Sequence, residues 1–181
     1  GPHDECNFGM KVASAGDVNG DGFSDIIIGA KDFDNGHHQE GAAFVYLGSE
    51  NGPSTSFDWM SQSNLENCNW GNSVASAGDV NGDGYSDIII GAPRYSEGDT
   101  LEGAAFVFYG SPSGLGVNGT PGNADWSAVI GGTQCFFGWS VACAGDVNGD
   151  GYADVAVGAY GYSKNHTAAG IAMAWYGSAA G

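Results

Sequence analysis

The stretch DVNGDGYSD, residues Asp79–Asp87, occurs three times in this chain with small changes. It reads DVNGDGFSD at Asp17–Asp25 and DVNGDGYAD at Asp146–Asp154. In every copy, oxygen-bearing side chains occupy positions 1, 3, 5 and 9, and glycines occupy positions 4 and 6. A nonapeptide that recurs with its polar positions unchanged indicates a repeated structural unit rather than one acidic site.

The three copies are embedded in a longer repeat. An aromatic–glycine pair precedes each copy, beginning at Phe8, Trp70 and Phe137, so the period is roughly 65 residues. An apolar run follows each copy, and a second apolar run follows after a connection of equal length. The second unit is longer because of extra residues between Gly110 and Trp126. An insertion confined to one connection predicts a surface loop.

Each unit predicts four short strands, which we name A to D. In the second unit, A is Ser73–Ala77, B is Asp87–Ile90, C is Ala104–Tyr109 and D lies around Trp126. Short segments rich in β-branched and aromatic residues favour strands over helices. Continuous apolar runs are typical of strands that are covered on both faces. The pattern predicts an all-β chain of antiparallel, four-stranded β-propeller blades. A β-sandwich is the alternative, which the recurring groups of four strands disfavour.

The polar positions of the nonapeptide suit a divalent cation. Calcium takes six to eight oxygen ligands, and a loop that curls around an ion turns alternate side chains inward. Position 7 offers its backbone carbonyl, and Gly82 and Gly84 allow the positive φ that a sharp curl requires. Magnesium fits less well, because it demands a tighter octahedron and keeps its waters. The sequence therefore predicts three calcium-binding loops, each between strands A and B.

Two other interpretations of these loops compete with this one. The first six residues match an EF-hand, but an EF-hand needs a bidentate glutamate at position 12. This chain has Ile28, Ile90 and Val157 there, inside apolar runs. Loops rich in Asp and Asn can also satisfy their own backbone without a metal. Converging carboxylates would repel one another in the absence of a cation, so we favour calcium in a β-hairpin.

The order FG…VASAGDVNGDGYSDIIIGAP…GAAFVFYG resembles the FG-GAP repeat, found in the propeller of integrin α subunits and in many bacterial surface and secreted proteins. The resemblance covers the chain from Phe8 to Gly177, although the GAP motif is intact only at Gly91–Pro93. It implies calcium in each A–B loop. The implied ligands are Asp17, Asn19, Asp21, Phe23 (carbonyl) and Asp25; Asp79, Asn81, Asp83, Tyr85 (carbonyl) and Asp87; and Asp146, Asn148, Asp150, Tyr152 (carbonyl) and Asp154.

The chain departs from the family in the number of its units. Propellers of this family typically have seven blades, and a closed ring needs about four or more. We expect a lead-in segment at 1–7 and three blades at 8–69, 70–136 and 137–181, of which the third lacks strand D. Either the chain is part of a larger propeller or several copies complete one. An open stack of three blades would expose an apolar flank at each end, which predicts self-association.

The composition excludes several classes of partner. Lys+Arg number 4 against 21 Asp+Glu, so the formal net charge is −17. This charge disfavours nucleic acid and anionic lipid, and it suits cations. No apolar run approaches the length that crosses a bilayer, so we expect no membrane insertion. The hydrophobic content of 42% indicates a folded chain.

The four cysteines give weaker indications. Cys6, Cys68 and Cys135 occupy equivalent positions, which neighbouring blades hold too far apart for a disulfide. Cys143 replaces a serine on strand A, and we expect it to be a small core residue. A bridge between Cys135 and Cys143 stays open.

The B–C connections have equal length and divergent content, as expected where a scaffold presents different side chains from one face. The resemblance implies that B–C and D–A loops share the face opposite the calcium loops. This candidate ligand face comprises Lys31, Phe33, His37, His38, Arg94, Tyr95, Tyr160, Tyr162 and Lys164.

We predict a non-enzymatic, calcium-stabilised β-propeller module of a secreted or cell-surface protein, which acts outside the cell in adhesion or in recognition of a protein or glycan ligand. No catalytic or cofactor-binding residues are predicted, and no G-x-S-x-G elbow is present. The alternatives are an ancillary propeller of a secreted polysaccharide-acting enzyme and a purely structural repeat.

Overall fold

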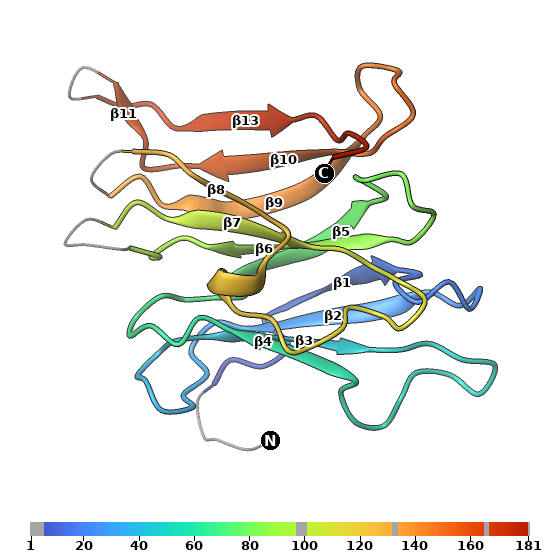
Figure 1. The fold of residues 1–181 in the computed structure, drawn as a ribbon. Helices are drawn as coiled ribbons and strands as arrows, with labels where there is room; N and C mark the ends of the chain where they lie inside the picture. The colour runs from blue at the N-terminus through green and yellow to red at the C-terminus, as the bar shows by residue number, and fades with distance from the viewer. Residues whose placement is uncertain (1–5, 97–100, 132–133, 165–166, 181) are drawn as a thin grey trace.

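Three separate antiparallel sheets lie one above the other along the chain (Figure 1). The computed structural model describes residues 6–96, 101–131, 134–164 and 167–180. In the two four-stranded sheets, strands that are consecutive along the chain pair side by side, and in the third sheet β10 lies between β9 and β13. The first sheet comprises β1 (Lys11–Gly16), β2 (Asp25–Ala30), β3 (Ala42–Tyr46) and β4 (Trp59–Gln62). The second comprises β5 (Ser73–Gly78), β6 (Asp87–Ala92), β7 (Ala104–Phe108) and β8 (Trp126–Val129). The third comprises β9 (Phe137–Gly145), β10 (Asp154–Ala159) and β13 (Ile171–Trp175).

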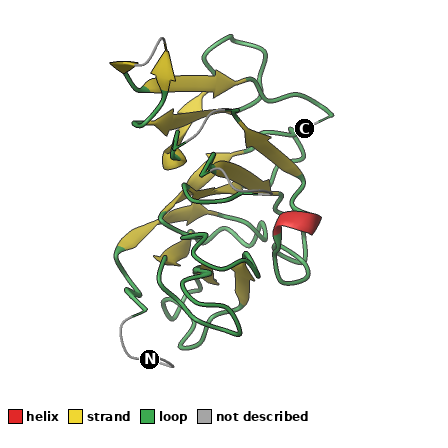
Figure 2. Ribbon diagram, turned by 90° about the vertical axis from the view of Figure 1, so that its left-hand side faces the viewer, coloured by secondary structure: helices red, strands yellow, loops and turns green. Residues whose placement is uncertain are grey.

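These sheets are successive blades of a partial β-propeller, as the sequence predicts, and they are called the first, second and third blade below. Within the described residues, the third blade has strands A to C. Burial follows from the stacking. Every residue of β6 is buried because its blade has a neighbour on both sides, whereas β2 and β10 each contain half-exposed residues. Figure 2 shows the same stack of strands from the side, with the loops and turns that join them.

The aromatic residue that opens each repeat reaches into the preceding blade. Trp70 forms a parallel bridge with Gly41 of the first blade, and Phe137 forms the same bridge with Gly103 of the second. Both aromatic side chains are fully buried, whereas the equivalent Phe8 has no preceding blade and is 48% exposed. The core is therefore made by pairs of blades, and each seam uses the same residues.

Two local features differ from the sequence-based expectations. The third B–C connection contains a short hairpin of β11 (Ser163–Lys164) and β12 (Thr167–Ala168), where we expect only loop. The connection between Gly110 and Trp126 contains one 3-10 turn, η1 (Pro121–Asn123), and it is not simply a surface loop. Its Gly119 is buried and pairs with Ser61 of the first blade, because this connection crosses the blade seam.

Candidate metal centres

The three acidic nonapeptides connect strands A and B of their blades and lie at one end of the strands, while the B–C connections lie at the other (Figure 1). A β-bulge precedes each nonapeptide, since the pairing shifts between Ser14 and Gly16, and between Ser76 and Gly78. Gly16 and Gly78 have φ of 81° and 77°, which glycine adopts at no steric cost. The bulge turns the chain out of the sheet and into the loop.

Within each loop, the carboxylate at position 1 organises the backbone. In the second loop, Asp79 Oδ1 accepts hydrogen bonds from the amides of Gly82 and Asp83 at 2.7 and 3.0 Å. Asp79 Oδ2 accepts one from Gly84 at 2.9 Å. Asp17 and Asp146 accept the matching bonds in the first and third loops. These bonds lower the pKa of the exposed Asp146 below its usual range, with the Gly151 amide contributing most.

The side chains at positions 3 and 5 support this curl. Asn81 Oδ1 accepts a hydrogen bond from the amide of Asp83, and Asp83 Oδ1 accepts one from the amide of Tyr85, both at 3.0 Å. The Asn81 amide group also donates to Asp83 Oδ2 at 2.9 Å. The same bonds recur in both sister loops. Three separate segments therefore adopt one conformation.

The carboxylate at position 9 is buried and ties the loop to the sheet. Asp87 accepts a hydrogen bond from the Val80 amide at 2.8 Å and another from the Gly110 amide, just after β7, at 2.9 Å. Asp25 and Asp154 make the same pair of bonds. Sequence reasoning missed the glycine that follows strand C as the second donor. The signal was available, because Gly48, Gly110 and Gly177 end the C segment of every repeat.

Burial dominates the electrostatics of position 9. It raises the pKa of Asp87 to about 7, against two backbone hydrogen bonds that lower it, and the charges of Asp83 and Asp79 raise it further. Burial likewise raises the pKa of Asp25. A cation beside these carboxylates would counter both the desolvation and the repulsion.

The donor set fits calcium in its chemistry. Each loop offers three carboxylates, one amide oxygen and one backbone carbonyl, all hard oxygen donors. An ionised carboxylate has about four lone-pair sites, so those of Asp79, Asp83 and Asp87 keep acceptor capacity beyond the bonds described above. Over the described part of the chain, however, no three acidic, histidine or cysteine side chains already converge on one point. The fifteen residues are thus gathered into three loops in which the position-9 carboxylate faces the sheet.

At the opposite end of the blades, the structure corrects part of the candidate ligand face. Phe33 and Tyr95 are each only 6% exposed. Their rings pack edge-on against Phe44 and Phe106 at centroid distances of 5.6 and 5.2 Å. The cause is a tight turn after strand B, in which the amides of Phe33 and Tyr95 donate back to Ala30 and Ala92. Both residues belong to the blade core, and the half-buried Tyr162 packs similarly in the third blade.

Other members of this face remain at the surface. His37, His38, Arg94 and Tyr160 are exposed, and Lys31 is half-buried in an ion pair with Asp32 at 3.0 Å. The side chain of Lys164 lies outside the described residues. The D–A connection reaches the same end, since the Asn67 amide donates to the His38 carbonyl at 2.7 Å.

All four cysteines are free. Cys6, Cys68 and Cys135 are buried. Cys143 is exposed, contrary to the core position that the sequence suggested, although it faces the second blade: a Cβ on Gly78 would lie 3.2 Å from its Sγ. No bridge joins Cys135 to Cys143.

Comparison with known proteins agrees with this architecture. The FG-GAP repeat matches residues 8–46, 70–108 and 137–172, and the chain belongs to this family of β-propeller repeats. It is 36% identical to integrin alpha-4 of Xenopus laevis over 84% of the chain and 39% identical to integrin alpha-5 of Xenopus laevis over 85%. It is also 35% identical to integrin alpha-6 of Homo sapiens over 84% of its length. The chain spans only 14%, 15% and 12% of these three relatives.

In the described residues, no helix is both long and apolar enough to cross a membrane.

Proposed function

We propose that this chain is a calcium-binding segment of an extracellular adhesion propeller, in which the ions hold the A–B loops and the opposite loop face contacts a protein or glycan ligand. The observation that carries the proposal is the threefold recurrence of one oxygen-rich loop in one conformation. The similarity to integrin alpha chains supports the adhesion role. On this proposal the chain has no catalytic role of its own.

The proposed ligands in each loop are the side chains at positions 1, 3, 5 and 9 and the carbonyl at position 7. Calcium would supply positive charge among carboxylates in a chain whose formal net charge is −17. The position-9 carboxylate already accepts amides from the loop and from the end of strand C. An ion bound there would therefore stabilise the junction between the loop and strands B and C. We assign the bound ion a structural function, because the three A–B loops are alike whereas the three B–C connections differ.

Calorimetric titration of the EDTA-treated chain with CaCl2 tests this assignment. We expect about three ions per chain and a rise in melting temperature, since an ion that prefers the folded loops stabilises them by mass action. Asp83→Asn keeps the oxygen that accepts the Tyr85 amide but removes the charge, and it should abolish one of the three sites. Glu50→Gln, at an exposed position on a neighbouring turn, is the matched control and should leave all three. No heat of binding and an unchanged melting temperature would reject the calcium assignment.

The ligand face needs a separate test, because it lies at the other end of the strands. We expect Arg94→Ala and Tyr160→Ala to weaken binding on glycan arrays or to immobilised extracellular-matrix proteins at least several-fold, while Glu50→Gln leaves it unchanged. Arg94→Ala removes an exposed side chain and should leave the melting temperature within about 1 °C. Tyr160→Ala also removes ring contacts with Phe136 and Trp139, at centroid distances of 5.1 and 4.7 Å, and should lower the melting temperature. If binding survives both variants, ligand recognition does not use this face.

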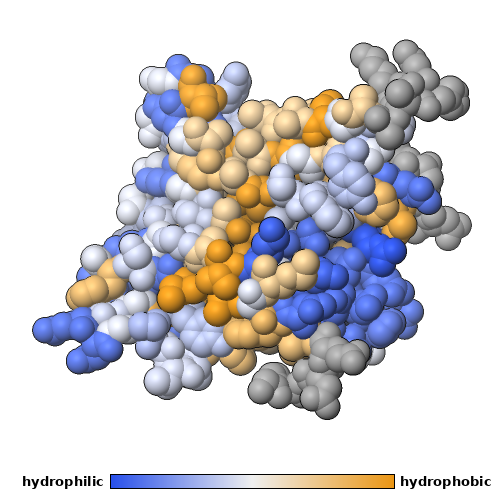
Figure 3. Space-filling model, turned by 180° about the vertical axis from the view of Figure 1, so that it is seen from behind, coloured by the Kyte–Doolittle hydropathy of each residue, from blue (hydrophilic) through white to orange (hydrophobic). Residues whose placement is uncertain are grey.

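We also propose that the chain self-associates through its uncovered blade flanks. From behind, an apolar band crosses the molecule (Figure 3). Val12 of the first blade is 62% exposed, and Val147 and Tyr176 of the third are 57% and 65% exposed. Light scattering should report a species heavier than 18.4 kDa, which Val147→Lys shifts towards the monomer. A monomer at all concentrations would refute this part of the proposal.

A further inference from the structure

The three A–B loops contact one another in series along the stack of blades. The contacts between the first and second loops recur between the second and third. We propose that Tyr85 and Tyr152 are positioning residues for the loop of the preceding repeat, so that the three loops bind calcium as a coupled series. The proposal rests on the calcium assignment made above and adds an interaction between its sites.

The first observation is a pair of main-chain hydrogen bonds that joins the first loop to the second repeat. The Ser86 amide, at position 8 of the second loop, donates to the carbonyl of Asp17, at position 1 of the first loop, at 2.9 Å. The Ser111 amide, which follows strand C of the second blade, donates to the Val18 carbonyl at 3.0 Å. The backbone at positions 1 and 2 of the first loop is therefore held by the repeat that follows.

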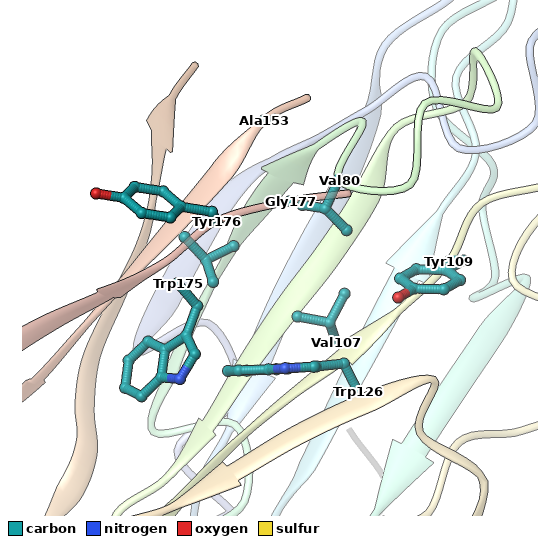
Figure 4. A pocket seen from close by; sticks show the side chains of 9 residues that line it. Val80, Val107, Tyr109, Trp126, Ala153, Trp175, Tyr176 and Gly177 are labelled. Carbon is teal, nitrogen blue, oxygen red and sulfur yellow. The ribbon is translucent and has the colours of Figure 1, made fainter. Parts of the chain in front are cut away.

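The joint between the second and third loops has the same bonds. The Ala153 amide donates to the Asp79 carbonyl and the Ser178 amide donates to the Val80 carbonyl, both at 2.9 Å. Figure 4 shows Val80 beside Gly177, and a Cβ on Gly177 would lie 2.6 Å from the Val80 carbonyl oxygen. The backbones of neighbouring repeats are in direct contact here, so a shift in one loop displaces the other.

The second observation is an aromatic ring that reaches from one loop onto the loop before it. A Cβ on Gly20, at position 4 of the first loop, would lie 2.6 Å from Cε1 of Tyr85. A Cβ on Gly82, at position 4 of the second loop, would lie 2.5 Å from Cε1 of Tyr152. All three copies of the nonapeptide have Phe or Tyr at position 7. A backbone carbonyl ligand does not require an aromatic side chain, whereas this contact does.

The glycine beneath each ring fixes the carboxylate at position 1. The Gly20 amide donates to Asp17 Oδ1 at 2.7 Å, and the Gly22 amide donates to Oδ2 of the same carboxylate at 2.8 Å. A ring packed against Gly20 restricts the motion of its amide, and therefore the orientation of Asp17, which is a proposed calcium ligand. The second joint repeats this arrangement with Gly82 and Asp79.

Tyr85 thereby connects two proposed ion sites. Its carbonyl is the position-7 ligand of the second loop, and its amide donates to Asp83 Oδ1 at 3.0 Å. Its ring lies against the first loop. An ion in the second loop would restrict Tyr85 and so reduce the entropy that the first loop loses when it orders around its own ion. Because coupling between binding free energies is reciprocal, occupation of the first loop favours the second by the same factor.

Calorimetric titration of single-site chains with CaCl2 tests the proposal. Asp83→Asn combined with Asp150→Asn leaves the first loop as the one complete site. Adding Tyr85→Leu should weaken its calcium affinity about fivefold, the lower end of the range for coupled sites. Tyr85→Phe keeps the ring and should restore the affinity. Tyr176→Leu makes the same change at an exposed tyrosine of the third blade, and it is the matched control that should leave the affinity unchanged.

The location of the effect separates positioning from a general loss of stability. Asp21→Asn combined with Asp150→Asn leaves the second loop as the one complete site. Tyr85→Leu should weaken this loop less than it weakens the first, because leucine keeps the position-7 carbonyl. Tyr152→Leu should weaken the second loop about fivefold. Equal weakening of both loops by Tyr85→Leu, or no weakening of the first, would overturn the proposal.

Calcium binding by the parent chain distinguishes this proposal from the one on which it rests. If the parent chain binds calcium and the ring substitutions have no effect, the loops are independent sites and only the coupling is rejected. If the parent chain binds no calcium, the calcium assignment is rejected and the coupling with it.

If Tyr85→Leu does not fold, hydrogen exchange gives the answer on a chain with both rings intact. Asp21→Asn removes a ligand from the first loop, so added CaCl2 fills the second and third loops. Exchange of the Gly20 and Gly22 amides should then slow by roughly threefold, because Tyr85 becomes fixed against the first loop. Exchange in the first loop that does not respond to calcium would reject the coupling.

Discussion

Replacing Asp87 by alanine in a calcium-free buffer separates what the position-9 carboxylate does for the fold from what it does for a metal. The side chain is fully buried, and it accepts hydrogen bonds from the Val80 and Gly110 amides at 2.8 and 2.9 Å. These two amides belong to the A–B loop and to the end of strand C. Alanine leaves both of them buried without an acceptor.

The size of the effect follows from those two donors. An unsatisfied buried donor costs about 1–3 kcal/mol, so the two together destabilise the fold by roughly 4 kcal/mol. Burial raises the pKa of Asp87 to about 7, which means that the carboxylate itself carries a desolvation penalty that alanine removes. The net loss of unfolding free energy should therefore be about 3 kcal/mol. For a chain of this size it corresponds to a fall in melting temperature of about 6–12 °C.

Urea unfolding in EGTA, followed by tryptophan fluorescence, measures this loss. Asp83→Ala is the matched control from the same loop. Asp83 is exposed, and water can replace its bond to the Tyr85 amide, so it should lose less than about 1 kcal/mol in EGTA. Calcium should stabilise Asp87→Ala less than it stabilises the parent chain, because the variant keeps only two of the three proposed sites. The reasoning fails if the two variants lose equal stability without calcium, or if Asp87→Ala stays within 1 kcal/mol of the parent chain.

Three further predictions concern other parts of the chain. Val18→Asp places a charge in a fully buried seam and should lower the free energy of unfolding in urea by more than about 3 kcal/mol. Val147→Asp, at the same motif position but 57% exposed, should lower it by less than about 0.5 kcal/mol. Equal losses in the two variants would contradict the described seam. Phe33→Ala should lower the free energy of unfolding by about 3 kcal/mol because its ring is in the core, while His38→Ala should change it little. If Phe33→Ala leaves the free energy of unfolding unchanged in the same assay, Phe33 belongs to the ligand face. Burial raises the pKa of the Cys68 thiol from 9.0 to about 12, so the stability it contributes is present below about pH 9 and is lost as pH rises towards 12. In native buffer a thiol reagent should label Cys143 rapidly and Cys68 only after urea is added, and rapid labelling of Cys68 would disprove its burial.

The sequence predicted the propeller blades and the place of every acidic loop, because both depend on local patterns. The apolar runs define strands A to C, and the bulge with its glycine is encoded just before each nonapeptide. The contacts at the seams between blades depend instead on the distance between neighbouring blades. The requirement for glycine at Gly29, whose Cβ would lie 2.1 Å from the Gly71 carbonyl, follows from the distance between two blades and has no local signature.

The candidate ligand face shows the same limit. Phe33 and Tyr95 occupy a variable connection and have the composition of binding residues. Whether such a ring points outward depends on a turn that folds it back over Phe44 or Phe106, and that turn is not visible in the composition of the loop. The contact of Leu115 with the first blade was not predicted for a similar reason, since its partner is a strand that lies more than fifty residues earlier in the chain.

The two sides of the seam between blades are not equivalent, because the later repeat donates the hydrogen bond and the earlier repeat accepts it. This affects how repeats can be added to such a chain. The amide of Ser86 in the second blade donates to the Asp17 carbonyl of the first, and Ala153 of the third donates in the same way to Asp79 of the second. Each repeat is thus completed by its successor and never by its predecessor at this contact. A repeat inserted by duplication would reproduce both halves of the joint and leave the existing joints intact. Arrays of different length can therefore arise from a single repeat design, with only the trailing surface changing its surroundings.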